Sequence, residues 1–149
     1  RPCKLLAGEA LLLDGTSLWE AGLQDGSIVT AVVEGLQDVH GTFHAFCAVT
    51  SDGSVIVWGS PRHGGNLGGT GAVPGKIARL YSNDAAFSAI LDTGSVCAWG
   101  SSAHGGDGFE SVMDIRDAKE LYSTSCAFAA VTGGGGVLTW GDPSWGGHS

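Results

Sequence analysis

The sequence predicts an all-β fold built from three consecutive copies of one antiparallel unit. Three tryptophans, Trp58, Trp99 and Trp140, are separated from one another by steps of 41 residues. The same step recurs in a second set of positions, at Phe46, Phe87 and Phe128, and in the glycine pairs at 64/65, 105/106 and 146/147. A fixed period without insertions is typical of tandem repeats in which each copy is one supersecondary element.

Each copy is expected to contain a β-hairpin. In the first copy the apolar stretch Ala45–Thr50 precedes the β-branched segment Ser54–Trp58, and Asp52-Gly53 separates the two. A glycine at the second turn position supplies the positive φ that a tight hairpin turn requires. The later copies hold Thr93-Gly94 and Gly134-Gly135 at this place.

A further strand is expected in each unit. Ile77–Ser82 and Ala118–Ser123 both end in Leu-Tyr-Ser, and Val39-His40 holds their place in the first copy. Because an isolated hairpin is only marginally stable, the units are expected to stack, with Trp and Phe filling the space between them. Small residues would let neighbouring sheets approach closely: Ala45, Ala48, Ala86, Ala89, Ala127 and Ala130.

These elements predict propeller-blade-like units of three or four short strands. Three such units are too few to close a ring, so we expect a partial propeller or an open β-solenoid with exposed edges. The domain boundaries follow from the repeat: a segment at 1–34, then the repeats at 35–149, with copies at 36–76, 77–117 and 118–149. The last copy is incomplete.

The first copy resembles the regulator-of-chromosome-condensation repeat. It contains Gly41 followed by His44, a small-apolar strand, the Asp52-Gly53 turn, a strand ending in Trp58-Gly59, and the Gly64-Gly65 loop. This resemblance implies a propeller blade. Gly41 and His44 do not recur in the later copies, and nothing corresponds to the wedge that the family uses for nucleotide exchange on a small GTPase. We therefore do not expect exchange activity.

The N-terminal segment resembles the C-terminal half of a ubiquitin-like domain. The resemblance is carried by Cys3–Glu9, Leu11, Asp14-Gly15, Ala21–Leu23, Asp25–Ile28 and Thr30–Val33. It implies either a binding surface around Leu5 or a remnant that caps the repeats. Conjugation is not expected, because Glu34-Gly35 leads directly into the repeats instead of ending in a Gly-Gly tail.

The acidic charge of the chain argues against nucleic-acid binding. The chain has 15 acidic and 7 basic residues, a formal net charge of −8, and no cluster of basic residues. Nucleic-acid binding requires a basic surface and is not expected.

No apolar run reaches the length of about 18 residues needed for a transmembrane helix. The chain begins at Arg1 without methionine, which suggests a processed or truncated N-terminus.

The four cysteines are expected to be small buried residues. They lie at Cys3, Cys47, Cys97 and Cys126, with no CxxC pair and no zinc-binding spacing. This usage favours a reducing compartment, either the cytosol or an organelle interior. The localisation is otherwise unknown.

No catalytic, cofactor-binding or metal-binding residues are predicted. His63 and His104 each precede a glycine pair and are expected to be solvated loop residues. The acidic cluster at Glu110, Asp114, Asp117 and Glu120 predicts a solvated charged face on a helical turn or loop. The four glycines at 133–136 lack the Lys-Ser/Thr of a phosphate-binding loop and are expected to form a hairpin turn.

The predicted function is that of a non-catalytic structural or protein-interaction module, with interface candidates at Trp145, Trp140 and Leu5. The expected partners are other protein subunits that cover the exposed edges, with no cofactor, small-molecule substrate or nucleic acid. Such a chain would suit an accessory subunit of a larger assembly, organellar or membrane-associated, for example a photosynthetic or respiratory complex. The alternative is a fragment of a larger ubiquitin-pathway or small-GTPase-regulating repeat protein.

Overall fold

The computed structural model describes residues 35–67, 72–106 and 115–148, together with the backbone of three short strands nearer the N-terminus. The chain divides into two compact units, Arg1–Leu36 and Gln37–Ser149. Each unit has its own antiparallel pairing, so the two are described separately.

The first unit contains one small antiparallel sheet. Its strands are β1 (Lys4–Ala7), β2 (Ala10–Leu12) and β3 (Val29–Val32), in the order β2-β1-β3. In the centre strand, Leu5 lies opposite Leu12 on one side and Ala31 on the other. The ubiquitin-like character of this segment stays a prediction.

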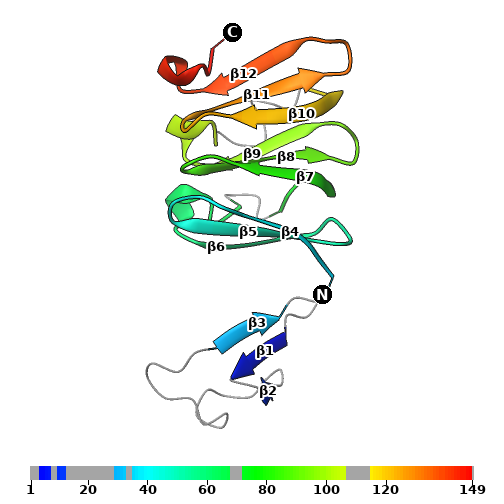
Figure 1. Cartoon of the computed structure of the whole chain (residues 1–149), viewed down its shortest axis with the longest axis vertical. Coiled ribbons are helices and arrows are strands. Elements are labelled where there is room, and N and C mark those ends of the chain that lie inside the picture. Colours follow the sequence, from blue (N-terminus) through cyan, green and yellow to red (C-terminus); the bar gives the residue numbers. More distant parts are fainter. Residues whose placement is uncertain are drawn as a thin grey trace. The chain divides into compact units, whose positions relative to one another are not determined.

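The repeats form three blades, each a three-stranded antiparallel sheet in sequential strand order. The first blade contains β4 (Leu36–Gly41), β5 (Ala45–Thr50) and β6 (Val55–Gly59). The second contains β7 (Ile77–Ser82), β8 (Ala86–Leu91) and β9 (Val96–Gly100). The third contains β10 (Ala118–Ser123), β11 (Ala127–Thr132) and β12 (Val137–Gly141). The second blade lies between the other two (Figure 1), and the blades do not close into a ring, which confirms the all-β partial-propeller prediction.

Local sequence explains the hairpin at the centre of each blade. The turn glycines Gly53, Gly94 and Gly135 adopt φ angles of 81°, 82° and 82°, as predicted from their position in the turn. The glycine run at 133–136 is therefore a hairpin turn, also as predicted. The strands Ala45–Thr50, Ile77–Ser82 and Ala118–Ser123 have the predicted bounds.

Because side chains alternate along a strand, each inner strand presents a front face to the next blade and a rear face to the previous one. Between the first and second blades, Ala45, Cys47 and Val49 pack with Phe87 and Ala89 in one buried cluster. A second cluster between the second and third blades includes Ile90, Ala98, Leu121 and Ala130. Ala45, Ala89 and Ala130 lie in these two clusters, which confirms the predicted role of the small alanines at those three positions.

The stacking role predicted for Phe and Trp is confirmed in the later copies but wrong for the first. Phe87 and Trp99 on the rear face of the second blade are 0% and 2% exposed, whereas Phe46 and Trp58 are 49% and 46% exposed. The difference in exposure arises because a rear face is buried only where the preceding blade packs on it. The first blade presents its rear face where no other described blade packs.

Repeat-equivalent phenylalanines should therefore differ in their contribution to stability. We expect Phe87→Ala to lower the free energy of unfolding by about 3–5 kcal/mol, because it leaves a cavity between two blades. Phe46→Ala should cost less than about 1 kcal/mol, because much of that ring is already in water. Urea denaturation of both variants at low protein concentration measures the difference. Equal losses would mean that Phe46 is buried in the isolated chain.

Candidate protein-interaction surfaces

Each blade ends in a glycine loop, defined here as the short 3-10 helix after its last strand together with the Gly-Gly pair that follows. The helices are η1 (Pro61–His63), η3 (Ser102–His104) and η4 (Pro143–Trp145). The first glycine of each pair takes a left-handed conformation, with φ of 92° at Gly64, 83° at Gly105 and 93° at Gly146. The three loops therefore share one backbone geometry.

The loop histidines are structural residues. In the first two loops a serine hydroxyl lies 3.0 Å from the histidine Nδ1, between Ser60 and His63 and between Ser101 and His104. Both rings are half-buried, so they are more enclosed than the solvated loop histidines expected from the sequence. The described residues contain no group of three or more His, Cys, Asp or Glu side chains arranged to hold a metal ion.

The glycine loop of one blade holds the aromatic pair of the next. Phe87 and Trp99 lie opposite each other on neighbouring strands, with stacked rings 5.6 Å apart. A Cβ atom placed on Gly64 would lie 2.5 Å from the Phe87 ring, so only glycine allows this approach. At the following interface, a Cβ on Gly105 would lie 3.1 Å from the Phe128 ring.

Large apolar side chains are exposed at the two ends of the blade array. The first-blade end includes Val39, Phe43, Phe46 and Trp58, and the third-blade end includes Tyr122, Val137 and Trp145. Among the described residues, the second blade contributes no large apolar side chain of comparable exposure. Exposed apolar surface of this kind, gathered in patches, typically marks a contact site.

The interface residues predicted from the sequence lie in different surroundings. Trp145 lies on η4 and is 51% exposed. Trp140 is half-buried and stacks on Phe128 at 5.7 Å, so it also supports the packing between blades. Leu5 belongs to the first unit, and its side chain lies outside the described residues.

The aromatic residues of the first-blade end were not among the interface residues predicted from the sequence. Phe43 is 72% exposed, and Phe46 stacks on Trp58 with ring centroids 5.5 Å apart. The available signal was position in the array. A first copy has no preceding glycine loop in register, so its Phe-Trp pair has no cover of that kind.

The third-blade end contains an apolar hollow of about 130 Å³. Its lining includes Ala127 and Ala129 of β11, together with Tyr122, Trp145 and Gly146. Gly146 is exposed, whereas Gly64 and Gly105 are buried. A Cβ on Gly146 would meet no atom within 4 Å. This glycine loop is therefore open.

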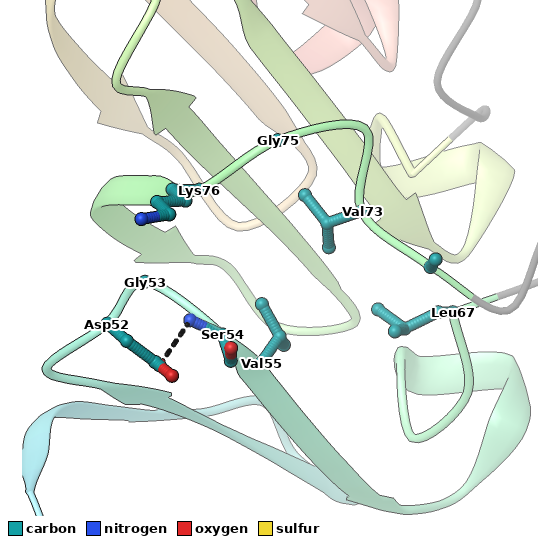
Figure 2. Close-up of a pocket in the computed structure, with 9 residues that line it drawn as sticks. Asp52, Gly53, Ser54, Val55, Leu67, Val73, Gly75 and Lys76 are labelled. Atoms are coloured by element: carbon teal, nitrogen blue, oxygen red, sulfur yellow. Dashed lines mark hydrogen bonds between the residues drawn. The ribbon is translucent and has the colours of Figure 1, made fainter. Parts of the chain in front are cut away.

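A larger groove, of about 360 Å³, lies beside the first hairpin turn (Figure 2). Asp52 and Lys76 are the charged residues of its lining, and Leu67 and Val73 supply apolar surface. The Asp52 carboxylate accepts a hydrogen bond from the Ser54 amide at 3.1 Å and another from the Thr50 hydroxyl. This carboxylate therefore stabilises the turn.

The acidic cluster forms a solvated charged face, as predicted, where it is described. Glu120 lies 3.8 Å from Arg79 of the neighbouring blade, and Asp117 pairs with Lys119 at 2.6 Å. Glu120 lies in strand β10, so the expectation of a helical turn or loop is wrong at that position. Glu110 and Asp114 lie outside the described residues.

The buried cysteines are poor nucleophiles. Burial between the first two blades raises the pKa of both Cys47 and Cys97 to about 12. The thiolate is the reactive form, so these thiols are inert at neutral pH. The prediction of small buried residues is confirmed for both, whereas Cys126 is half-buried and Cys3 lies outside the described residues.

Thiol labelling should separate these environments. In a Cys3→Ser background we expect Cys126 to react first with an aromatic disulfide reagent at pH 8. Cys47 and Cys97 should react only as the chain unfolds, because they are buried and protonated in the folded state. Mass spectrometry of the labelled peptides identifies the order. Fast labelling of all three in the native protein would contradict the packing described here.

No protein-family model matches the chain, and no curated protein matches its sequence. Its fold matches solved structures. The blades are similar to yeast RCC1, Prp20, in a complex with Kap60 (TM-score 0.59, 16% identity, 76% of this chain and 33% of that one). A structure of Prp20p from Saccharomyces cerevisiae gives a TM-score of 0.58 at 15% identity, covering 76% and 34%.

A plant propeller is similar as well. The CRINKLY WD40 ectodomain of the Arabidopsis thaliana receptor kinase ACR4 gives a TM-score of 0.55 at 15% identity, with 79% of this chain and 40% of that one covered. The repeats are propeller blades. The chain spans about a third of the length of the two Prp20 structures. None of the described helices is both long and apolar enough to cross a membrane.

Substitution of equivalent loop glycines tests the packing of the aromatic pairs. Gly64→Ala and Gly146→Ala share the strain of a left-handed alanine, about 1–2 kcal/mol. Gly64→Ala should lose a further 1–3 kcal/mol or so, because its methyl group would overlap Phe87. Chemical denaturation at low protein concentration measures both variants. Losses of equal size would contradict the close contact at Gly64.

Proposed function

We propose that the blades form a protein-interaction module that carries out no chemistry of its own. The observation that supports this most directly is the pair of exposed apolar ends, which flank a well-packed second blade. Both ends are rich in aromatic side chains, which are over-represented in protein interfaces and among the residues that dominate binding energy. The Asp52 carboxylate and the rings of His63 and His104 form hydrogen bonds within turns and loops.

The architecture supports the same proposal. A repeat array buries its apolar surface between neighbouring copies, so its terminal copies each keep one uncovered face. Such faces are normally polar in proteins that remain monomeric, because capping repeats are required for solubility. Here Phe46 and Trp58 occupy one uncovered face, and Tyr122 and Val137 mark the other end. Protein partners are the class of ligand that such surfaces fit.

In finer detail, we propose that the module serves as an accessory subunit that packs on other proteins within a larger assembly, organellar or membrane-associated. The N-terminal segment predicted at 1–34 would act as a ubiquitin-like contact around Leu5, and the repeats predicted at 35–149 would act as the main contact. The alternative is a fragment of a larger ubiquitin-pathway or small-GTPase-regulating repeat protein. Its support is the likeness to Prp20, which was solved bound to Kap60 and was studied for its binding to Gsp1p and histones.

Site-specific photo-crosslinking tests the interaction proposal. A photoreactive amino acid is placed at Trp58 or at Trp145, and the chain is exposed to native cell extract before irradiation. We expect protein adducts at both positions, because both side chains are half exposed within apolar patches. Mass spectrometry then identifies the adducts, whether other proteins or the chain itself.

Thr93 provides the matched control position. It is exposed on the hairpin turn of the second blade, outside both apolar ends. Adducts in equal amount at position 93, or none above background at positions 58 and 145, would remove the support for the proposal.

A further inference from the structure

We propose that two copies of this chain associate head to tail, with the first-blade end of one copy packed on the third-blade end of the other. The Phe46 ring of the stacked pair Phe46–Trp58 would enter the hollow beside Gly146 of the second copy. This inference rests on the proposed role of the two ends as interaction surfaces, and it names their occupant.

The chain already contains two examples of the contact that this association would form. In each, the rear-face Phe-Trp pair of one blade packs on the front face and glycine loop of the blade before it. Phe87 is 0% exposed and Phe128 is 1% exposed in this arrangement. The third Phe-Trp pair, Phe46–Trp58, keeps the same stacked geometry, with an interplanar angle of 22° against 27° and 24° in the buried pairs.

The hollow at the third-blade end provides the complementary surface. Ala127, Ala129 and Gly146 of the hollow occupy the repeat positions of Ala45, Cys47 and Gly64. Those three first-blade residues pack around the Phe87 ring. The hollow measures about 130 Å³. For comparison, an apolar protein cavity of about 150 Å³ takes up a benzene ring. Its size and lining therefore suit a phenyl group.

A backbone hydrogen-bond ladder points to the same register. The Phe43 amide donates to the Asp84 carbonyl at 2.9 Å, and the Asp84 amide donates to the Ser125 carbonyl at 3.4 Å. Each step advances by one blade. Continued by one more blade, the ladder would join the Ser125 amide of one copy to the Phe43 carbonyl of the next.

The hairpin turns repeat this relation at the other edge of the blades. The carbonyls of Gly53 and Gly94 accept hydrogen bonds from Ile77 and Ala118 of the following blade, both at 3.0 Å. The equivalent turn glycine of the third blade is Gly135, and a Cβ there would meet no atom within 4 Å. The third blade is therefore open at both its turn and its glycine loop.

A second copy fits better than an unrelated protein because both halves of a known contact are exposed on the same chain. The contact joins two different surfaces, so it is heterologous and leaves one free end of each kind on a dimer. The chain carries a formal net charge of −8, so copies repel one another, and added salt should strengthen an apolar contact between them.

The test uses the full chain with one end altered at a time. Trp58→Ser alters the first-blade end at a half-exposed position. Gly146→Asn places a side chain in the hollow, and asparagine tolerates the left-handed conformation with φ of 93°. Thr93→Asn on the second blade is the control. Light scattering after size-exclusion chromatography gives the mass of each variant over a range of concentrations and at low and high salt.

We expect the mass of the unaltered chain and of the control to rise with concentration, and more so at high salt. Each single-end variant should need at least about a tenfold higher concentration to associate, since a central tryptophan or a blocked pocket dominates such a contact. The two variants mixed should form a 1:1 dimer, because each retains the end that the other lacks. Circular dichroism confirms that both variants are folded.

Three results would overturn the proposal. The first is a chain that stays monomeric at every concentration; in that case adducts with other proteins in the photo-crosslinking experiment would still support the interaction role. The second is loss of association in Trp58→Ser but not in Gly146→Asn, which would indicate a symmetric contact between two first-blade ends. The third is a mixture of the two variants that fails to associate.

Discussion

The contact between an aromatic pair and the glycine loop of the preceding blade determines how the array is built. A Phe-Trp pair is large and flat, and it can lie this close to the backbone only where the residue beneath has no Cβ. Gly64 meets that requirement, the approach at Gly105 is less close, and both glycines adopt a φ that is unfavourable for other residues. The constant step of 41 residues keeps each aromatic pair in register with the loop one blade earlier.

This contact also explains why the ends of the array differ from its middle. In a linear array with nearest-neighbour contacts, stability resides at the interfaces, and the second blade benefits from two of them. Its inner strand β8 is buried along its whole length, whereas Phe46 of β5 and Val137 of β12 are about half exposed. The apolar ends are thus the two faces of the described array on which no other described blade packs.

Much of the fold could be predicted from the sequence because the repeat aligns three independent copies. Turn glycines such as Gly94 and strands such as Ile77–Ser82 are short-range features, and their residue types decide them locally. The exposure of Phe46 could not be predicted from its own copy, because it depends on the presence or absence of a neighbouring blade. Glu120 is a residue whose local sequence spacing predicted the wrong conformation. Its spacing from other acids suggested a helical turn or loop, but pairing of β10 with β11 decides its conformation.

The third glycine loop keeps the backbone geometry of the two covered loops although no described blade packs on it. Asp142 replaces the serine of the earlier loops, and its carboxylate accepts a hydrogen bond from the Ser144 amide at 2.8 Å. Trp145 replaces the histidine, yet the loop keeps the Gly146 φ of its buried counterparts without an aromatic pair above it. A loop that already has the geometry of its covered counterparts would lose little conformational entropy if another surface packed on it. The chain therefore presents a preformed receptor at one end and a preformed aromatic pair at the other, and both are consequences of the same repeat.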